Sequence, residues 1–184
     1  MKVSFVYASP RKFGNSSKIA DYLYNIACRK NCEAEKWFLH DDNYSGCLSC
    51  NACKQGAAIC VIQDCIRQVL VSLMSTDILI VAVPIYYSGF NSAFMAFIER
   101  STSFFKYDDS IEEENIRLPK GKKMVILQTQ DNIIKDKIFF FKEYFESLGF
   151  IEQYFYCYSS TEVACSWEKI KGDIEVLSEN IFSL

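Results

Sequence analysis

Short apolar runs alternate with longer amphipathic stretches along the whole chain. Runs rich in β-branched and aromatic residues predict five strands, at residues 2–8, 33–39, 77–83, 123–129 and 151–158. Hydrophobic residues at helical spacing predict helices that begin after Ser16 and Ser17, two N-cap residues, and at residues 62–74, 92–105, 134–148 and 167–181. Gly149 lies where a C-cap glycine is expected. The pattern is therefore strand and helix in alternation.

The run from Asp77 to Val83 predicts a central strand, because a strand that is apolar at nearly every position is buried on both faces. Pro84 is expected to end it. Alternation implies parallel strands with right-handed crossovers and helices on both faces. We therefore predict an α/β fold: a flavodoxin-like doubly wound five-stranded parallel sheet of order 2-1-3-4-5, in one domain over residues 1–184 with a cysteine-rich loop at 47–65.

The composition is that of a globular domain. Half of the 184 residues are hydrophobic and 23% are charged, which is enough to bury a full core. A net charge of −3 and a pI near 5.3 favour neither nucleic acid nor an anionic membrane as a partner. The apolar stretches are too short for a signal peptide or a membrane span, so a cytoplasmic location is expected.

Four of the nine cysteines crowd into one segment. Cys47, Cys50, Cys53 and Cys60 have the spacing C-x2-C-x2-C-x6-C, which is close to that of iron–sulfur cluster ligands. The alternatives are a zinc site and a metal-free thiol or disulfide loop, with Cys65 as a further partner. The other four are interpreted as buried small hydrophobic residues: Cys28, Cys32, Cys157 and Cys165.

Three loops follow the expected carboxyl ends of central strands, where ligands of doubly wound sheets bind: residues 9–17, 84–91 and 128–132. The first contains hydroxyls, an amide, a glycine and two cations before a helix start, which favours binding of a phosphate. It lacks both the P-loop pattern and G-x-G-x-x-G. A plain polar turn with a serine N-cap is the alternative.

The second loop, Pro84-Ile85-Tyr86-Tyr87-Ser88-Gly89, suits contact with a flat conjugated ring, because its front is aromatic and its backbone offers polar groups. In the alternative interpretation the two tyrosines only cap a strand. The stripe of Phe94, Phe97 and Ile98 in the following helix is expected to face the core.

These motifs, in this order, resemble the NADPH-dependent FMN reductase family. The resemblance rests on four stretches: Ser9-Pro10-Arg11 with Gly14-Asn15-Ser16-Ser17; the cysteine run with Cys60-Val61-Ile62-Gln63-Asp64; Pro84-Ile85-Tyr86-Tyr87; and Ser92-Ala93 with Phe97-Ile98-Glu99-Arg100. The cysteine run is similar to that of the iron–sulfur flavoproteins within the family. The resemblance implies noncovalent FMN, NAD(P)H as electron donor, a homodimer or homotetramer, and in the iron–sulfur branch a [4Fe-4S] cluster near the flavin.

Carried over by position, the resemblance implies three groups of flavin-binding residues. Ser9, Arg11, Asn15, Ser16 and Ser17 would surround the phosphate; Pro84, Ile85, Tyr86 and Tyr87, with Ser88 and Gly89, would lie along the isoalloxazine; Gln128, Thr129, Gln130 and Asp131 would form the third loop. The four cysteines of the run would hold the cluster. Two departures from the family pattern are Ala8, where a glycine is usual, and the absence of a glycine in Gln130-Asp131-Asn132.

The sequence predicts an enzyme that moves electrons from NAD(P)H through FMN to a quinone, a free flavin or, by way of a cluster, a redox protein. Because flavin supplies the chemistry, no catalytic nucleophile or general base is assigned. His40, the single histidine, is interpreted as a surface residue at a strand end. The alternative function is a noncatalytic electron carrier, or a thiol or metal redox sensor, that uses the four-cysteine loop.

Overall fold

The structure is a computed structural model that describes residues 1–41, 43–56, 59–87, 89–106, 116–131 and 141–182. A parallel sheet forms its centre, in the order β2-β1-β3-β5-β6. Its strands are β1 (Lys2–Tyr7), β2 (Glu33–Phe38), β3 (Ile78–Tyr86), β5 (Lys122–Gln130) and β6 (Phe150–Ser159). A two-residue strand, β4 (Gly89–Phe90), pairs antiparallel with the end of β3. Apart from that hairpin, the predicted fold and strand order are confirmed.

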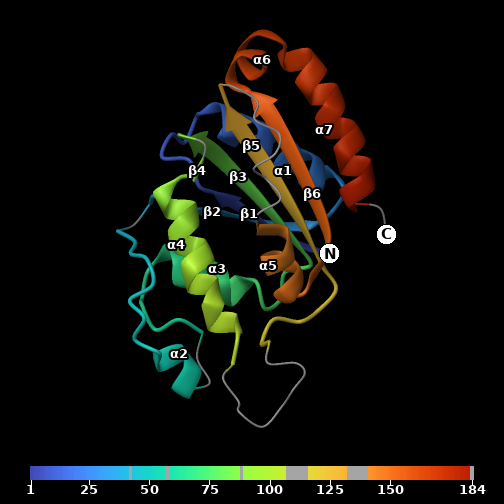
Figure 1. Ribbon diagram of the computed structural model, residues 1–184. Coiled ribbons are helices and arrows are strands. Elements are labelled where there is room, and N and C mark those ends of the chain that lie inside the picture. The colour runs from blue at the N-terminus through green and yellow to red at the C-terminus, as the bar shows by residue number, and fades with distance from the viewer. Residues whose placement is uncertain (42, 57–58, 88, 107–115, 132–140, 183–184) are drawn as a thin grey trace.

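Helices cover both faces of the sheet (Figure 1). The described helices are α1 (Asn15–Arg29), α2 (Ala52–Gln55), α3 (Cys65–Ser72), α4 (Ser92–Ser101), α5 (Lys142–Ser147), α6 (Ser160–Cys165) and α7 (Trp167–Phe182). One core lies between the sheet and α3, α4 and α5, and contains the predicted stripe of Phe94, Phe97 and Ile98. The other lies between the sheet and α1 and α7. Two cores, one on each face, are what a doubly wound sheet requires.

Pro84 does not end the central strand, contrary to the prediction. β3 continues to Tyr86, and Pro84 lies opposite Thr129 of β5. The carbonyl of Ala82 accepts a hydrogen bond from Ala8 on the β1 side, so Pro84, two residues later, has its nitrogen on that same side. β1 pairs with β3 only as far as Ala82. The pairing with β1 has therefore already ended at Pro84, so its lack of an N–H group costs no hydrogen bond between these strands.

Several helix boundaries also differ from the sequence prediction. α1 begins at Asn15 with Gly14 as its N-cap, so Ser16 and Ser17 lie inside the first turn. α3 begins at Cys65, later than predicted, because the Asp64 side chain accepts a hydrogen bond from the Arg67 N–H and caps the helix there. α2 and α6 are short helices that the hydrophobic pattern does not reveal.

The C-terminal half agrees with the prediction where it is described. Gly149 has a φ of 99°, as expected of a C-cap glycine, and α7 matches the predicted last helix. Most of the helix predicted at 134–148 lies outside the described residues, which resume with Phe141 and α5. None of the described helices is both long enough and apolar enough to span a bilayer.

The four cysteines that the sequence analysis interpreted as buried small hydrophobic residues are not buried, so that interpretation was wrong. Cys28 and Cys165 are exposed, and Cys32 and Cys157 are half-buried. Cys28 follows Ile26 and Ala27, which face the core from α1, so the helical turn carries it toward solvent.

Candidate functional site

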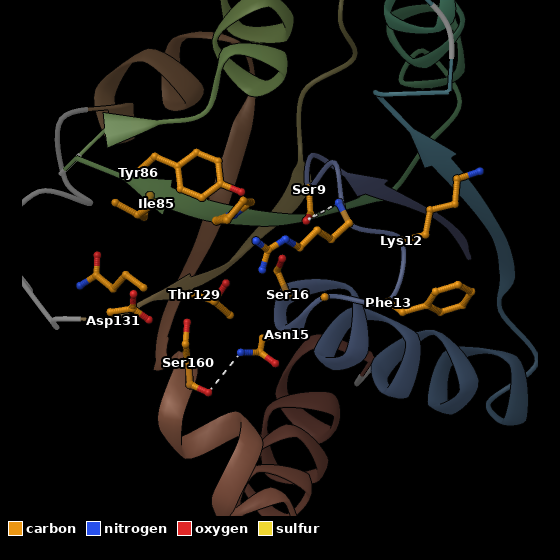
Figure 2. A pocket seen from close by; sticks show the side chains of 14 residues that line it. Ser9, Lys12, Phe13, Asn15, Ser16, Ile85, Tyr86, Thr129, Asp131 and Ser160 are labelled. Atoms are coloured by element: carbon orange, nitrogen blue, oxygen red, sulfur yellow. Dashed lines mark hydrogen bonds between the residues drawn. The ribbon is translucent and has the colours of Figure 1, made fainter.

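A cleft of about 710 Å³ opens at the carboxyl ends of β1, β3 and β5, beside the switch point of the sheet. Figure 2 shows Ser9, Ile85, Tyr86 and Thr129 around it. The volume is that of a site for a small ligand or cofactor. The predicted site residues that line it are Ser9, Arg11, Asn15, Ser16, Pro84, Ile85, Tyr86, Thr129, Gln130 and Asp131.

The loop after β1 is folded by its own hydrogen bonds. The Arg11 N–H donates to Ser9 Oγ at 3.1 Å, and the Arg11 carbonyl accepts from the Gly14 N–H at 3.0 Å and from Ser17 Oγ at 3.1 Å. Ser17 is fully buried and does not line the cleft. Ser17 therefore stabilises the conformation of the loop through its hydrogen bond to Arg11, whereas the sequence predicts that it contacts a ligand.

The N-terminus of α1 opens into the cleft, where Gly14, Asn15 and Ser16 line it. No side chain caps this end of the helix among the described residues, so the first backbone N–H groups have no intrahelical partner. A Cβ on Gly14 would lie 3.2 Å from the Arg11 carbonyl oxygen, a tight contact that favours glycine in this turn. Helix N–H groups, the helix dipole and the Arg11 guanidinium together suit an anion such as a phosphate.

The end of β3 forms the opposite wall. Ile85 and Tyr86 pair with Phe90 and Gly89 in a tight hairpin, and the Tyr86 side chain is 47% exposed (Figure 2). Tyr87 has a φ of 48° and is fully exposed, and it does not line the cleft. Gly89 is also absent from the lining, and Ser88 lies outside the described residues.

The third predicted loop is in fact mostly strand. Gln128, Thr129 and Gln130 end β5, and Asp131 follows it. Gln128 does not line the cleft, and its Nε2 group donates a hydrogen bond to Gln130 Oε1 at 2.9 Å. The Gln130 Nε2 group, on a residue that is 7% exposed, has no partner among the described residues. A buried donor without a partner at the cleft wall fits an acceptor on a bound ligand.

Four further residues line the cleft but are not among the predicted contacts: Lys12, Phe13, Gly14 and Ser160. The carbonyl of Ser160 accepts a hydrogen bond from the Asn15 side-chain amide at 3.1 Å (Figure 2). The sequence motif Ser159-x-x-Glu162, a capping box that starts α6, is the signal that could have pointed to this turn. Lys12 and Phe13 lie at the rim with side chains that point away from the other labelled residues (Figure 2).

All four cysteines of the run line a second cavity, of about 450 Å³. Cys60 is buried, Cys53 on α2 is half-buried, and Cys47 and Cys50 are exposed. Within the described part of the chain, no three histidine, cysteine or acidic side chains converge as ligands of a single metal ion. Among the described residues, the four cysteines of the run thus share one cavity but do not form a compact site for a single ion.

The cysteine loop is held along α4. Its beginning is attached by the Tyr44 hydroxyl, 2.8 Å from Ser92 Oγ, and by the Cys47 N–H, which donates to Glu99 Oε2 at 3.0 Å. The Lys54 ammonium donates to the carbonyl of Phe105 at 2.7 Å, beyond the end of α4, and burial lowers its pKa. Figure 1 shows α2 at the opposite end of α4 from β4.

Among the residues that the structure describes, the cavity and the cleft share no lining residue. The ten residues of α4, about 15 Å of helix, lie between them, because the N-cap of α4, Asn91, bonds to the carbonyl of Ala8 next to the cleft. Within one chain the length of α4 thus separates the cysteine cavity from the ring-binding loop, whereas the family resemblance implies a cluster near the flavin. The contacts along α4 account for the difference.

His40 is half-buried, and its Nε2 lies 3.1 Å from the carbonyl oxygen of Ala8. It supports the turn that precedes Ser9 and lines neither cavity. His40 follows the end of β2, as the sequence predicts, but it is half-buried and is not the surface residue that was expected.

The sheet order, with a helix N-terminus and a cation at the switch point, defines a protein of the flavodoxin-like class. Residues 1–130 match the family model described as NADPH-dependent FMN reductase. The chain therefore belongs to that family.

Curated proteins named as iron–sulfur flavoproteins are similar in sequence to part of this chain. The iron–sulfur flavoprotein of Methanosarcina thermophila is 29% identical over 101 residues, which are 55% of this chain and 52% of that protein. The chain thus spans about half the length of that curated relative.

Two solved structures share the fold over nearly their whole length. The NAD(P)H:quinone oxidoreductase of Methanothermobacter marburgensis has a TM-score of 0.77 at 12% identity, covering 100% of this chain and 98% of that one. The FMN-dependent NADH-azoreductase of Bacillus anthracis, solved in complex with FMN, has a TM-score of 0.73 at 15% identity, covering 99% of each chain. At these identities the likeness concerns the fold.

Proposed function

We propose that this protein is an FMN-dependent oxidoreductase that takes electrons from NAD(P)H and passes them to a small acceptor such as a quinone or a free flavin. The observation that carries the proposal is the cleft at the switch point, where the N-terminus of α1 and Arg11 face the end of β3. Family membership and the names of the neighbouring structures support it. When bound, FMN accepts a hydride from NAD(P)H and supplies the redox chemistry.

The cleft residues fit FMN at both ends of the molecule. Arg11 and the free N–H groups of Asn15 and Ser16 would hold the phosphate. Ile85 and Tyr86 would lie along the ring, and the unpartnered Gln130 Nε2 would donate to an acceptor on the flavin. The chain's own task is to bind and orient the flavin and to keep water from one side of it. No protein acid or base is needed for that task.

The reductase activity is tested with flavin-loaded protein under anaerobic conditions. We expect oxidation of NADH or NADPH that depends on added quinone or free FMN, with the preferred nucleotide and acceptor read from kcat/KM. Flavin-loaded protein that oxidises neither nucleotide with any acceptor would contradict the proposal and favour a noncatalytic electron carrier.

We further propose that the four-cysteine cavity binds a [4Fe-4S] cluster that exchanges electrons with an external redox protein. A cubane cluster binds each thiolate at a different iron, so its ligands surround a space, which agrees with four cysteines around one cavity. The buried hydroxyl of Ser103, which lines the cavity, has no partner among the described residues and fits a sulfur acceptor. The name of the iron–sulfur flavoprotein relative supports the same assignment.

The cluster is tested by iron and acid-labile sulfide content after anaerobic reconstitution. Cys50→Ser is expected to lose iron and sulfide and to keep FMN, because Cys50 lines only the cysteine cavity. Cys28→Ser is the matched control, an exposed cysteine outside both cavities, and should keep both groups. Wild-type protein that binds no iron with sulfide would contradict the cluster and leave the FMN proposal standing.

A further inference from the structure

Arg100, at the end of α4, is a fully buried arginine whose side chain joins both ends of the cysteine loop. It donates to the Ser45 carbonyl at 3.3 Å before the run, and to the Ile62 carbonyl at 3.1 Å after it. Its Nε donates to Cys60 Sγ at 3.3 Å. A guanidinium is a planar fork of donors, and here the fork fixes the two ends of the loop relative to one sulfur.

The charge of Arg100 is balanced by a single buried carboxylate. Its side chain forms an ion pair with Asp64, whose side chain is 4% exposed. A buried ion pair is stable only if the remaining donors are also bonded, and one of those donors meets a sulfur. As a thiolate, Cys60 would give the trio a net charge of −1. The arrangement thus places a cation and an N–H donor at one expected cluster ligand.

Ser103 supplies a second donor to the same cavity. It is 1% exposed and lines the cysteine cavity, and its hydroxyl has no partner among the described residues. The neighbouring Ser101 is equally buried, but its hydroxyl bonds to the Ile98 carbonyl and to the Tyr144 hydroxyl, both at 2.6 Å, and does not line the cavity. Of these two buried serines, Ser101 bonds within the fold, whereas Ser103 lines the cavity with a hydroxyl that is available to a ligand.

We propose that Arg100 and Ser103 are positioning residues for the bound cluster, Arg100 through the Cys60 sulfur and Ser103 through a sulfur of the cluster or of its ligands. The inference rests on the proposed [4Fe-4S] cluster. Reduction adds one electron to the cluster and breaks no bond, and the added charge is shared by its sulfurs. Donors to those sulfurs stabilise the reduced form more than the oxidised form, so they raise the reduction potential.

The decisive variant is Ser103→Ala, with Ser101→Ala as its matched control. After anaerobic reconstitution, the midpoint potential of the cluster is measured by a titration followed by electron paramagnetic resonance. Ser103→Ala is expected to keep the wild-type melting temperature and iron content and to shift the potential to a more negative value. Ser101→Ala is expected to lower the melting temperature and to leave the potential unchanged, because it removes two hydrogen bonds within the fold.

Arg100→Lys tests the arginine separately. Lysine keeps the charge beside Asp64 but not the fork, so we expect a more negative potential, or loss of the cluster with FMN still bound. If that variant does not fold, the serine pair decides alone. If Ser103→Ala binds the cluster with an unchanged midpoint potential, the inference is wrong, but the proposed cluster is supported. If wild-type protein binds no cluster, both the inference and the proposed cluster are wrong.

Discussion

Two adjacent cations in the phosphate loop, Arg11 and Lys12, have different surroundings. Arg11 lines the cleft beside the N-terminus of α1. Lys12 forms an exposed ion pair with Asp41, at 2.6 Å, and its side chain points away from the labelled cleft residues (Figure 2). At the scale of single residues, the site therefore depends on which of two neighbouring charges faces the ligand.

Arg11→Ala is expected to weaken FMN binding by roughly 1.5–3 kcal/mol, which is about a 10- to 100-fold increase in Kd, because it removes a charge-assisted contact to the phosphate. Kd is measured by quenching of flavin fluorescence on titration with apoprotein. Lys12→Ala is the control and should change Kd by no more than about twofold, because an exposed ion pair contributes little. Equal effects of the two substitutions would show that the phosphate does not bind at Arg11.

The residues of the cleft differ in how well the sequence predicts them. Ser9 and Arg11 lie in one short loop between a strand and a helix, and Asn15 begins that helix, so local pattern identifies all three. Ser17 lies in the same motif but is buried, because one turn of helix carries it beneath the loop. Ser160 reaches the cleft only through the pairing of β6 with β5, a long-range contact that spacing along the chain does not encode.

At the scale of elements, α3 and α4 are joined by the ion pair of Asp64 and Arg100. Burial alone would raise the pKa of Asp64, but hydrogen bonds from Arg100 and from the Arg67 N–H outweigh it, so the pKa lies below its ordinary value. Asp64 also caps α3, where the hydrophobic pattern predicts an earlier helix start. The capping side chain of Asp64 thus sets the start of α3, which the hydrophobic periodicity places too early.

Because of the ion pair of Asp64 and Arg100, the free energy of unfolding is expected to depend on pH. Because the pKa of Asp64 is lower in the folded state, the folded protein releases a proton that the unfolded chain binds near pH 4. The contribution is complete above the ordinary aspartate pKa and is lost as pH falls through the folded value. Chemical unfolding of the apoprotein should therefore show wild type losing free energy of unfolding below about pH 5.

Asp64→Asn isolates the charge, because asparagine is also a good N-cap residue. At pH 7 the variant should be less stable by about 3 kcal/mol, since Arg100 is left buried without its counterion. Its loss of stability on acidification should be smaller than that of wild type. A variant with the stability and acid response of wild type would contradict the assigned ion pair.

At the scale of the whole molecule, the alternation of apolar runs and helical stripes predicts the sheet order, because parallel crossovers allow few alternatives. It does not place the cysteine loop, whose path along α4 depends on single contacts such as that of Cys47 with Glu99. The cleft and the cysteine cavity therefore lie at opposite ends of α4 within one chain. The homodimer or homotetramer that the family resemblance implies stays a prediction.

The central claim is that the cleft binds FMN by its phosphate as well as by its ring. The most direct test compares the Kd of FMN with that of riboflavin, which has the same ring and no phosphate, on the same apoprotein. FMN is expected to bind at least about 10-fold more tightly than riboflavin, through Arg11 and the N-terminus of α1. Equal affinity for the two flavins, or binding of neither, would contradict it.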